Sequence, residues 1–190
     1  MLTSSVFTNL GLEKGIVRLE AYSPKWKMLF DEEKQRILRE FGKDVSYLKV
    51  LRDLQHIGST AIPGIVAKPI LDIGLAVSTF RKGYLLVLPL EELGYEFMGE
   101  NGVPNRLYFN FGFPTTAHLH LFELGSPEWQ AHILFRDYLI QHPQAAQQYE
   151  QLKQDLAVRF RTERDKYTDG KAEFIHSIVE LARQEQAAGR

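Results

Sequence analysis

Residues 70–77 restrict the fold of this 190-residue chain more than any other stretch, because they are apolar except at Asp72 and Gly74. A short apolar run rich in Ile, Leu and Val is typical of a strand buried in the middle of a sheet. Side chains on a strand alternate between its two faces, so Asp72 and Gly74 share one face while Ile73 and Leu75 share the other. The sequence therefore predicts a central strand with a polar gap on one face.

Apolar periodicity elsewhere predicts the elements around this strand. Further strands are predicted at residues 16–20, within 48–57, and at 95–98, 106–111 and 117–123. Helices are predicted from 23 to 42, over 81–93, over 129–141, from 143 onward and over 171–187. We therefore expect an α/β (α+β) fold, a mixed β-sheet flanked by helices, with a C-terminal helical segment packed on the sheet. No repeat or long linker divides the sequence, so residues 1–190 are predicted to form a single domain in which 1–11 and 184–190 are flexible.

Charge and cysteine content exclude several kinds of site. The formal net charge is −1, and basic residues alternate with acidic ones along the predicted helices, so we expect no nucleic-acid partner. A small anionic ligand stays open, because one pocket can be positive on a neutral protein. The sequence has no cysteine, which excludes disulfides and cysteine zinc sites. Neither a secretory signal nor an apolar stretch of roughly 20 residues is present, so we expect a cytoplasmic protein without membrane association.

The segment from residue 56 to residue 72 contains the first candidate site. Gly58 is followed by Ser59 and Thr60 directly after a predicted strand. Such a turn can cradle a phosphate, since glycine allows close approach and the amides and hydroxyls donate to anionic oxygens. A plain tight turn is the alternative interpretation. The segment is not a Walker A loop, because Gly64 is not followed by the required lysine.

Asp72 and a pair of histidines form the second candidate site. A carboxylate in an apolar central strand is costly unless it is hydrogen-bonded, paired or bound to a metal. The alternative is a structural aspartate satisfied by loop amides or by Lys68. His118 and His120 are two residues apart on a predicted strand, so both imidazoles lie on one face and can bind a metal ion or an anion. A structural role for both histidines is equally open.

Several separated motifs, in order along the chain, resemble those of the GrpB family, also known as UPF0157, within the nucleotidyltransferase-like superfamily. The resemblance extends over nearly the whole chain. The matching positions are Tyr22, Ser23, Pro24, Trp26 and Phe30, the run from His56 to Asp72, the strand with His118 and His120, Trp129, the run 135–139, His142, Pro143, Ala145, Tyr149, Leu152 and Lys153, and finally Tyr167, Lys171, Phe174 and Ile175.

The resemblance implies a nucleotidyltransferase-like fold and assigns roles to the candidate residues. The superfamily pattern is a Gly-Ser turn, two carboxylates that flank one residue of a strand, and a third carboxylate on a later strand. The turn corresponds to Gly58 and Ser59, and the first carboxylate to Asp72. Gly74 stands where the second carboxylate is expected, and Glu123 is predicted to face away from the two histidines. One carboxylate is too little charge for two divalent ions, so any catalysis is predicted to use one metal ion at most.

Three functions follow as expectations. The first is a nucleotidyl- or phosphoryl-transferase-like protein that binds a nucleotide or another small phosphorylated ligand with a divalent metal, either Mg, Mn or another transition metal. The second is a non-catalytic nucleotide-binding or regulatory protein, and the third is a His/Asp metal-dependent hydrolase. The residues expected to bind phosphate or ligand are His56, Gly58, Ser59, Thr60 and Lys68, and those expected to act as catalytic groups and metal ligands are Asp72, His118 and His120. We also expect Ser59 and the three metal ligands to converge on one concave surface.

Overall fold

The computed structural model describes residues 10–189, and within them one mixed sheet has five strands. The strands are β1 (Leu51–Ile57), β2 (Leu71–Val77), β3 (Tyr95–Phe97), β4 (Leu107–Phe111) and β5 (Ala117–Glu123). They lie in the order β1-β2-β5-β4-β3, in which only the β2–β5 pair is parallel. The predicted mixed sheet is confirmed, and the β2 strand lies inside it with a partner on each side.

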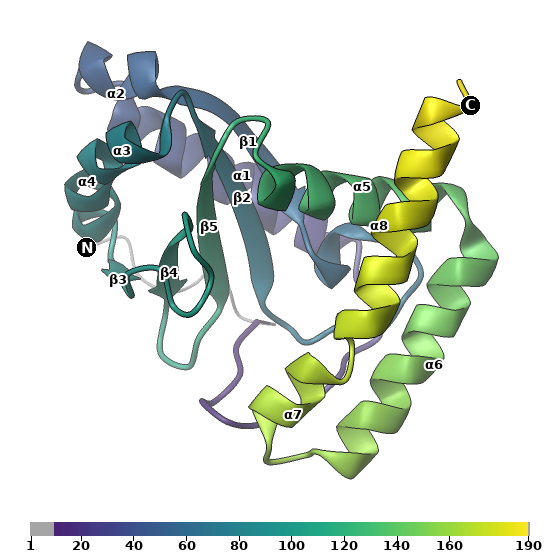
Figure 1. The fold of residues 1–190 in the computed structure, drawn as a ribbon. Coiled ribbons are helices and arrows are strands. Elements are labelled where there is room, and N and C mark those ends of the chain that lie inside the picture. The colour runs from purple at the N-terminus through teal and green to yellow at the C-terminus, as the bar shows by residue number, and fades with distance from the viewer. Residues whose placement is uncertain (1–9, 190) are drawn as a thin grey trace.

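Helices flank the sheet, and those of the C-terminal part gather on one side of the molecule (Figure 1). In the first part of the chain they are α1 (Lys25–Phe41), α2 (Val45–Val50), the 3-10 turn η1 (Ser59–Ala61), α3 (Phe80–Gly83), the 3-10 turn η2 (Tyr84–Leu86) and α4 (Val87–Glu92). In the C-terminal part they are α5 (Pro127–Gln141), α6 (Pro143–Arg159), α7 (Arg164–Asp169) and α8 (Ala172–Ala187). Within residues 10–189 no helix has the length and apolar character to cross a membrane.

The two faces of the sheet have different cores. One face carries Ile73, Leu75, Leu119 and Leu121, which belong to the same buried cluster as Trp26 and Ile37 of α1. On the other face Ala76 and Phe122 pack under Trp129 of α5. Strand alternation puts Asp72, Gly74, His118 and His120 on this second face. Apart from Glu123 at the end of β5, the polar residues of β2 and β5 thus lie on the side of the sheet that carries α5.

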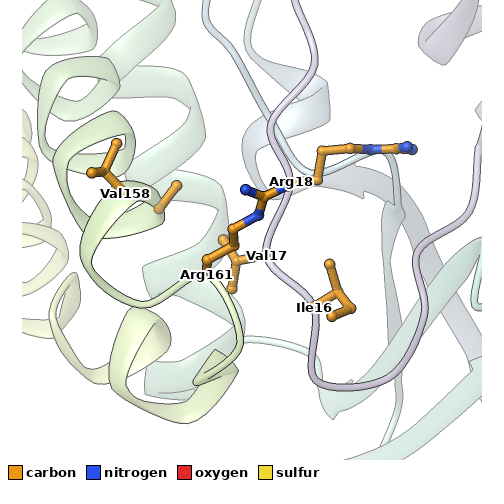
Figure 2. A pocket seen from close by; sticks show the side chains of 6 residues that line it. Ile16, Val17, Arg18, Val158 and Arg161 are labelled. Atoms are coloured by element: carbon orange, nitrogen blue, oxygen red, sulfur yellow. The ribbon is translucent and has the colours of Figure 1, made fainter.

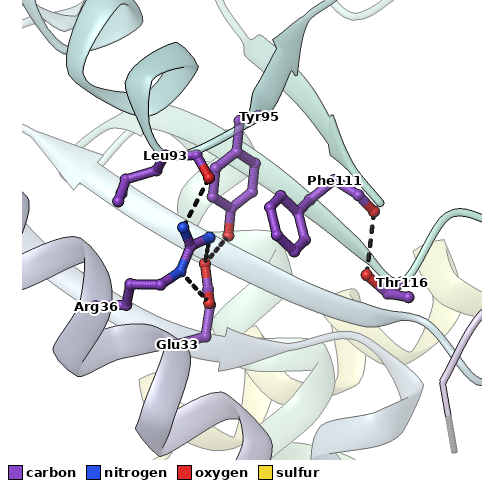
Figure 3. A network of polar contacts seen from close by, with 6 residues as sticks. All are labelled: Glu33, Arg36, Leu93, Tyr95, Phe111 and Thr116. Carbon is purple, nitrogen blue, oxygen red and sulfur yellow. Dashed lines mark hydrogen bonds and ion pairs between the residues drawn. The ribbon is translucent and has the colours of Figure 1, made fainter. Parts of the chain in front are cut away.

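A buried acid on α1 is satisfied by a hydrogen-bond network of its own (Figure 3). The Glu33 side chain is 3% exposed, and it accepts hydrogen bonds from the Arg36 guanidinium and, at 2.6 Å, from the Tyr95 hydroxyl. Arg36 also donates to the Leu93 carbonyl at 2.7 Å and stacks over the Phe111 ring at 4.8 Å. Paired charges of this kind tie α1 to β3 and β4, so Glu33 has a structural role.

The structure departs from the predicted elements in three places. The strand predicted at 16–20 is wrong, because this segment makes a single isolated bridge, between Glu20 and Ala67. The helix predicted over 81–93 is divided into three short helical pieces, and Pro89 has no amide hydrogen to continue one helical ladder. The short helices α2 and α7 were not predicted. Of the two ends predicted to be flexible, residues 1–9 and 190 lie outside the described residues, and α8 continues to Ala187.

Candidate metal and anion site

Parallel pairing of β2 with β5 brings the predicted metal ligands together. Asp72 is the register partner of His118, and Gly74 is the partner of His120. Asp72 Oδ1 lies 3.1 Å from His118 Nδ1 and 3.6 Å from His120 Nε2. One ligand atom from each of the three side chains lies within 4.8 Å of the others. The geometry therefore suits one small cation.

The hydrogen bonds of His118 settle its protonation. Arg164 Nη2 lies 3.1 Å from His118 Nε2, and a guanidinium can only donate, so Nε2 accepts. The ring proton of neutral His118 is therefore on Nδ1, which donates to Asp72. Burial lowers the pKa of His118 to about 4, against the opposing effect of Asp72. His118 is thus a neutral bridge between Arg164 and the carboxylate.

Asp72 is ionised and accessible. Burial opposes its ionisation, but hydrogen bonds from His118 and His120 bring the pKa of Asp72 well below its usual value. The Asp72 side chain is 30% exposed, so a ligand can reach it. The site thus offers one permanent negative charge at neutral pH.

His120 is the imidazole with spare hydrogen-bonding capacity. Its Nδ1 is buried and has no hydrogen-bond partner among residues 10–189. The ring lies 5.1 Å from that of Tyr108 and 5.5 Å from that of His132. Burial, followed by the nearby His120, lowers the pKa of His132 to about 3. His132 was not singled out from the sequence, because only the packing of α5 on the sheet brings it to β5.

The predicted phosphate turn packs against the Asp72 carboxylate. Gly58 has φ +68°, and a Cβ built there would lie 2.3 Å from Asp72 Oδ2. Ser59 follows in η1, and its hydroxyl donates to Tyr149 Oη at 3.5 Å. Only glycine fits at position 58, because its backbone occupies the space beside the carboxylate. Ser59 therefore lies next to the site but faces α6.

His56 and Thr60 bond to each other. His56 Nε2 and Thr60 Oγ1 are 2.9 Å apart, and the His56 ring stacks on Phe30 with centroids 4.8 Å apart. Thr60 is 2% exposed. Burial lowers the pKa of His56 to about 4. In this arrangement the two side chains hold the ends of the Gly58 turn together.

Lys68 lies near two other cations, Arg164 and Lys171. The sequence analysis did not identify these two as site residues. Lys68 Nζ lies 5.6 Å from the centroid of the Tyr167 ring, and Lys171 Nζ lies 4.7 Å from it. Arg164 is on the same short helix as Tyr167. Tyr167 and Lys171 were part of the family motif, which was the one available signal. Arg164 gave no signal, because α7 lacks a periodic apolar face.

Close packing surrounds Gly74, the position at which the superfamily pattern predicts a second carboxylate. A Cβ at Gly74 would lie 3.0 Å from Trp129 Cζ3 and 3.2 Å from Ile57 Cγ2. The indole of α5 therefore packs so closely on Gly74 that a side chain there would require it to shift. Glu123 is on the other face of β5 and accepts a hydrogen bond from the Phe80 amide at 2.8 Å, where α3 begins. Asp72 is thus the acid of the three-residue group.

A separate cavity lies away from these residues (Figure 2). It has a volume of about 380 Å³ and lies between the N-terminal segment and the end of α6. Its lining consists of Ile16, Val17, Arg18, Ala157, Val158 and Arg161. None of the predicted site residues takes part in it.

Comparison with known proteins gives a consistent family match. A family model described as GrpB protein matches residues 16–181. The UPF0157 protein YqkA of Bacillus subtilis is 37% identical over 169 residues, which are 88% of this chain and 48% of that protein. The glutamate-rich protein GrpB of Alkalihalophilus pseudofirmus is 35% identical over 176 residues, 90% of this chain and 98% of that protein. This chain therefore spans about half the length of the Bacillus subtilis relative and nearly all of the second.

A solved structure has the same fold. The crystal structure of the conserved protein GrpB from Enterococcus faecalis superposes with a TM-score of 0.79 at 33% sequence identity. The match covers 89% of this chain and 99% of the other. The mixed sheet with flanking helices is therefore an arrangement shared with that protein.

Proposed function

This chain belongs to the GrpB family, and on that premise we propose that it is a nucleotidyl- or phosphoryl-transferase-like protein that binds a phosphorylated small molecule with one divalent metal ion. The observation that carries the proposal is the group of Asp72, His118 and His120, whose ligand atoms lie within 4.8 Å of one another. Three convergent donors from two adjacent strands, held on rigid elements, are what a metal site requires.

The donor set fits one ion. It supplies one carboxylate oxygen and two imidazole nitrogens, a mixture that favours Mn, Zn, Ni or Fe over Mg. Both nitrogens of His118 already have partners, so His118 would exchange its contact with Arg164 or with Asp72 for a metal bond. A side chain at position 74 would press against the Trp129 ring and Ile57, so a second acid there would require both to shift. A single carboxylate supports one ion rather than the pair used in two-metal transfer.

The residues of the chain would divide the work. A bound metal ion would neutralise charge on the phosphate oxygens of the ligand. Asp72 would hold the ion as the one anionic ligand, and the backbone of Gly58, which packs against the carboxylate, would keep it in position. Arg164, released from His118, would present a guanidinium fork to the same phosphate.

A non-catalytic ligand-binding protein is the second candidate, and the Trp129 ring is the observation that favours it. With Gly74 packed against Trp129 in place of a second carboxylate, the protein would still bind a ligand but would lack the acid needed for two-metal chemistry. A metal-dependent hydrolase would use the same three donors with a transition metal. Incubation with labelled nucleotides and Mn²⁺ or Mg²⁺ separates the three, because only transfer yields a labelled acceptor and only hydrolysis yields free phosphate.

Metal titration tests the site itself. We expect calorimetry to show one Mn²⁺ per chain, with tighter binding of Mn²⁺ than of Mg²⁺. Asp72→Asn should weaken Mn²⁺ binding at least tenfold, because the amide keeps the hydrogen bond from His118 but loses the negative charge. Glu123→Gln is the matched control, since it removes a charge from the same sheet and still accepts from the Phe80 amide. Two tightly bound Mg²⁺ ions without nucleotide, or unchanged binding in Asp72→Asn, would overturn the proposal.

A further inference from the structure

Three half-buried cations lie around the Asp72 site without acids of their own. They are Lys68 before β2, Arg164 on α7 and Lys171 at the start of α8, together called the cationic site below. Within residues 10–189 none of the three makes an ion pair with a carboxylate. Arg164 contacts the neutral His118, and the two ammonium groups rest against the ring of Tyr167. Positive charges in partly buried positions are normally paired, so an anion bound among these three would stabilise them.

Tyr167 brings the two lysines to one place. Its side chain is 1% exposed, and both Nζ atoms lie within 5.6 Å of its ring centroid. A tyrosine ring offsets part of the cost of a nearby cation, but it carries no charge. Arg164 lies 3.1 Å from His118, which in turn donates to Asp72. Both lysines are close enough to Arg164 and Asp72 to interact with their charges, so the three cations gather beside Asp72.

The charges of the cationic site repel one another. Burial lowers the pKa of Lys68 to about 7, and Arg164 and Lys171 lower it further against the effect of Asp72. Burial also lowers the pKa of Lys171 to about 8, while Asp72 opposes the shift and Arg164 adds to it. An anion placed among these groups would relieve the repulsion and bring both lysines back to their charged form.

We propose that the cationic site binds the dianionic phosphate of a phosphate monoester beside Asp72. The proposal rests on the proposed function for its ligand class and names the part of the ligand that the chain recognises. Three positive charges facing one carboxylate leave an excess of two, and a phosphate monoester carries close to two negative charges at neutral pH. A phosphodiester carries one charge and would leave the site half neutralised. Arg164 adds the planar fork that matches two phosphate oxygens.

The test uses the full-length chain in EDTA, so that no metal contributes. Methyl phosphate and dimethyl phosphate are titrated at constant ionic strength by calorimetry. We expect methyl phosphate to bind at least tenfold more tightly than dimethyl phosphate. Lys68→Gln and Lys171→Gln should each weaken methyl phosphate binding at least tenfold. Lys166→Gln is the matched control on α7, because Lys166 is exposed and paired with Glu163, and it should leave binding within twofold.

A second measurement guards against a folding defect. Lys171→Gln removes a repelled charge, so its melting temperature without phosphate should equal or exceed that of the wild type. Equal affinity for the two esters would overturn the proposal, and so would an equal loss in Lys166→Gln and Lys171→Gln. Mn²⁺ binding without methyl phosphate binding would also overturn it while leaving the metal site standing. Methyl phosphate binding in EDTA, together with no Mn²⁺ binding, would support the cationic site and would contradict only the proposed metal site.

Discussion

The backbone of Gly58 lies directly against the carboxylate of Asp72, so this one residue fixes where the acid stands. We predict that Gly58→Ala destabilises the fold by roughly 2–4 kcal/mol, because it adds a contact far below van der Waals distance to the strain of a positive φ. Gly64→Ala is the control in the same loop: its φ is +84°, and a Cβ there meets nothing within 4 Å. Its cost should be the backbone strain alone, about 1–2 kcal/mol. Urea unfolding of both variants measures the difference.

Metal binding gives the same pair of variants a second readout. Gly58→Ala should weaken Mn²⁺ binding because the carboxylate has to move, whereas Gly64→Ala should not. Equal stability losses with equal Mn²⁺ affinities would mean that Asp72 moves aside freely, and the role given to Gly58 would then be wrong.

For single residues, the sequence predicts on which face of a strand a side chain lies, but it does not predict which distant residues that side chain contacts. The period of two in β2 and β5 was sufficient to put Asp72, His118 and His120 on one surface. It could not place Arg164, because the contact with His118 depends on how α7 packs against the sheet. Nor could it show that Ser59 faces Tyr149, since that contact spans 90 residues of chain.

At the scale of elements, α6 holds the loop that leads into β2. The Val66 amide donates to Glu150 Oε1 at 2.8 Å, and the Val66 carbonyl accepts from Lys153 Nζ. Lys153 is 1% exposed and lies 4.6 Å from the centroid of the Tyr149 ring. Since Val66 is two residues before Lys68, α6 positions one member of the cationic site.

We predict that Glu150→Ala loosens this loop and that Glu150→Gln does not. Alanine leaves the Val66 amide without a partner, at a cost of about 1–3 kcal/mol, whereas glutamine still offers an oxygen. The Val66 amide should exchange with deuterium at least tenfold faster in Glu150→Ala than in wild type, and at a near wild-type rate in Glu150→Gln. Unchanged exchange in both variants would show that the loop is held by other contacts.

Elements with strong periodicity were predictable, and those fixed by local capping were missed. The central strand and the strand with the two histidines are within a residue of their predicted bounds, because both are runs of alternating or continuous apolar residues. Helix α2 has six residues and depends on the Asp44 cap, which accepts from the Ser46 amide at 2.7 Å. A cap signal without apolar periodicity was too weak to predict a helix.

At the scale of the whole molecule, the layer arrangement was predictable and the strand order was not. A buried central strand requires cover on both faces, which fixes a sheet between helices. The order β1-β2-β5-β4-β3 depends on packing between distant segments. The same packing places Trp129 of α5 close over Gly74, which explains why a residue without a side chain stands at this position. Sequence alone could show only that an expected acid was missing.

Burial of neutral histidines makes the stability of the whole molecule depend on pH. Burial lowers the pKa of His56 to about 4, that of His118 to about 4 and that of His132 to about 3. In the unfolded chain a histidine takes up its proton near pH 6.5. Between these values the unfolded state binds more protons than the folded state, so a fall in pH favours unfolding.

We predict that the free energy of unfolding falls as pH drops from 6.5 to 4 and that His56→Gln makes this fall shallower. The His56 contribution is complete above pH 6.5 and is lost by about pH 4, below which both states are protonated. One proton of difference corresponds to at most about 1.4 kcal/mol per pH unit.

His56 is suited to the test because its partners are Thr60 and the Phe30 ring, outside the metal ligands. Urea unfolding at intervals from pH 7 to 4.5 gives the slope, with the exposed His176→Gln as the control. A slope in His56→Gln equal to that of the wild type would mean that His56 takes up its proton at the same pH in the folded and unfolded states, and the lowered pKa given to the buried ring would then be wrong.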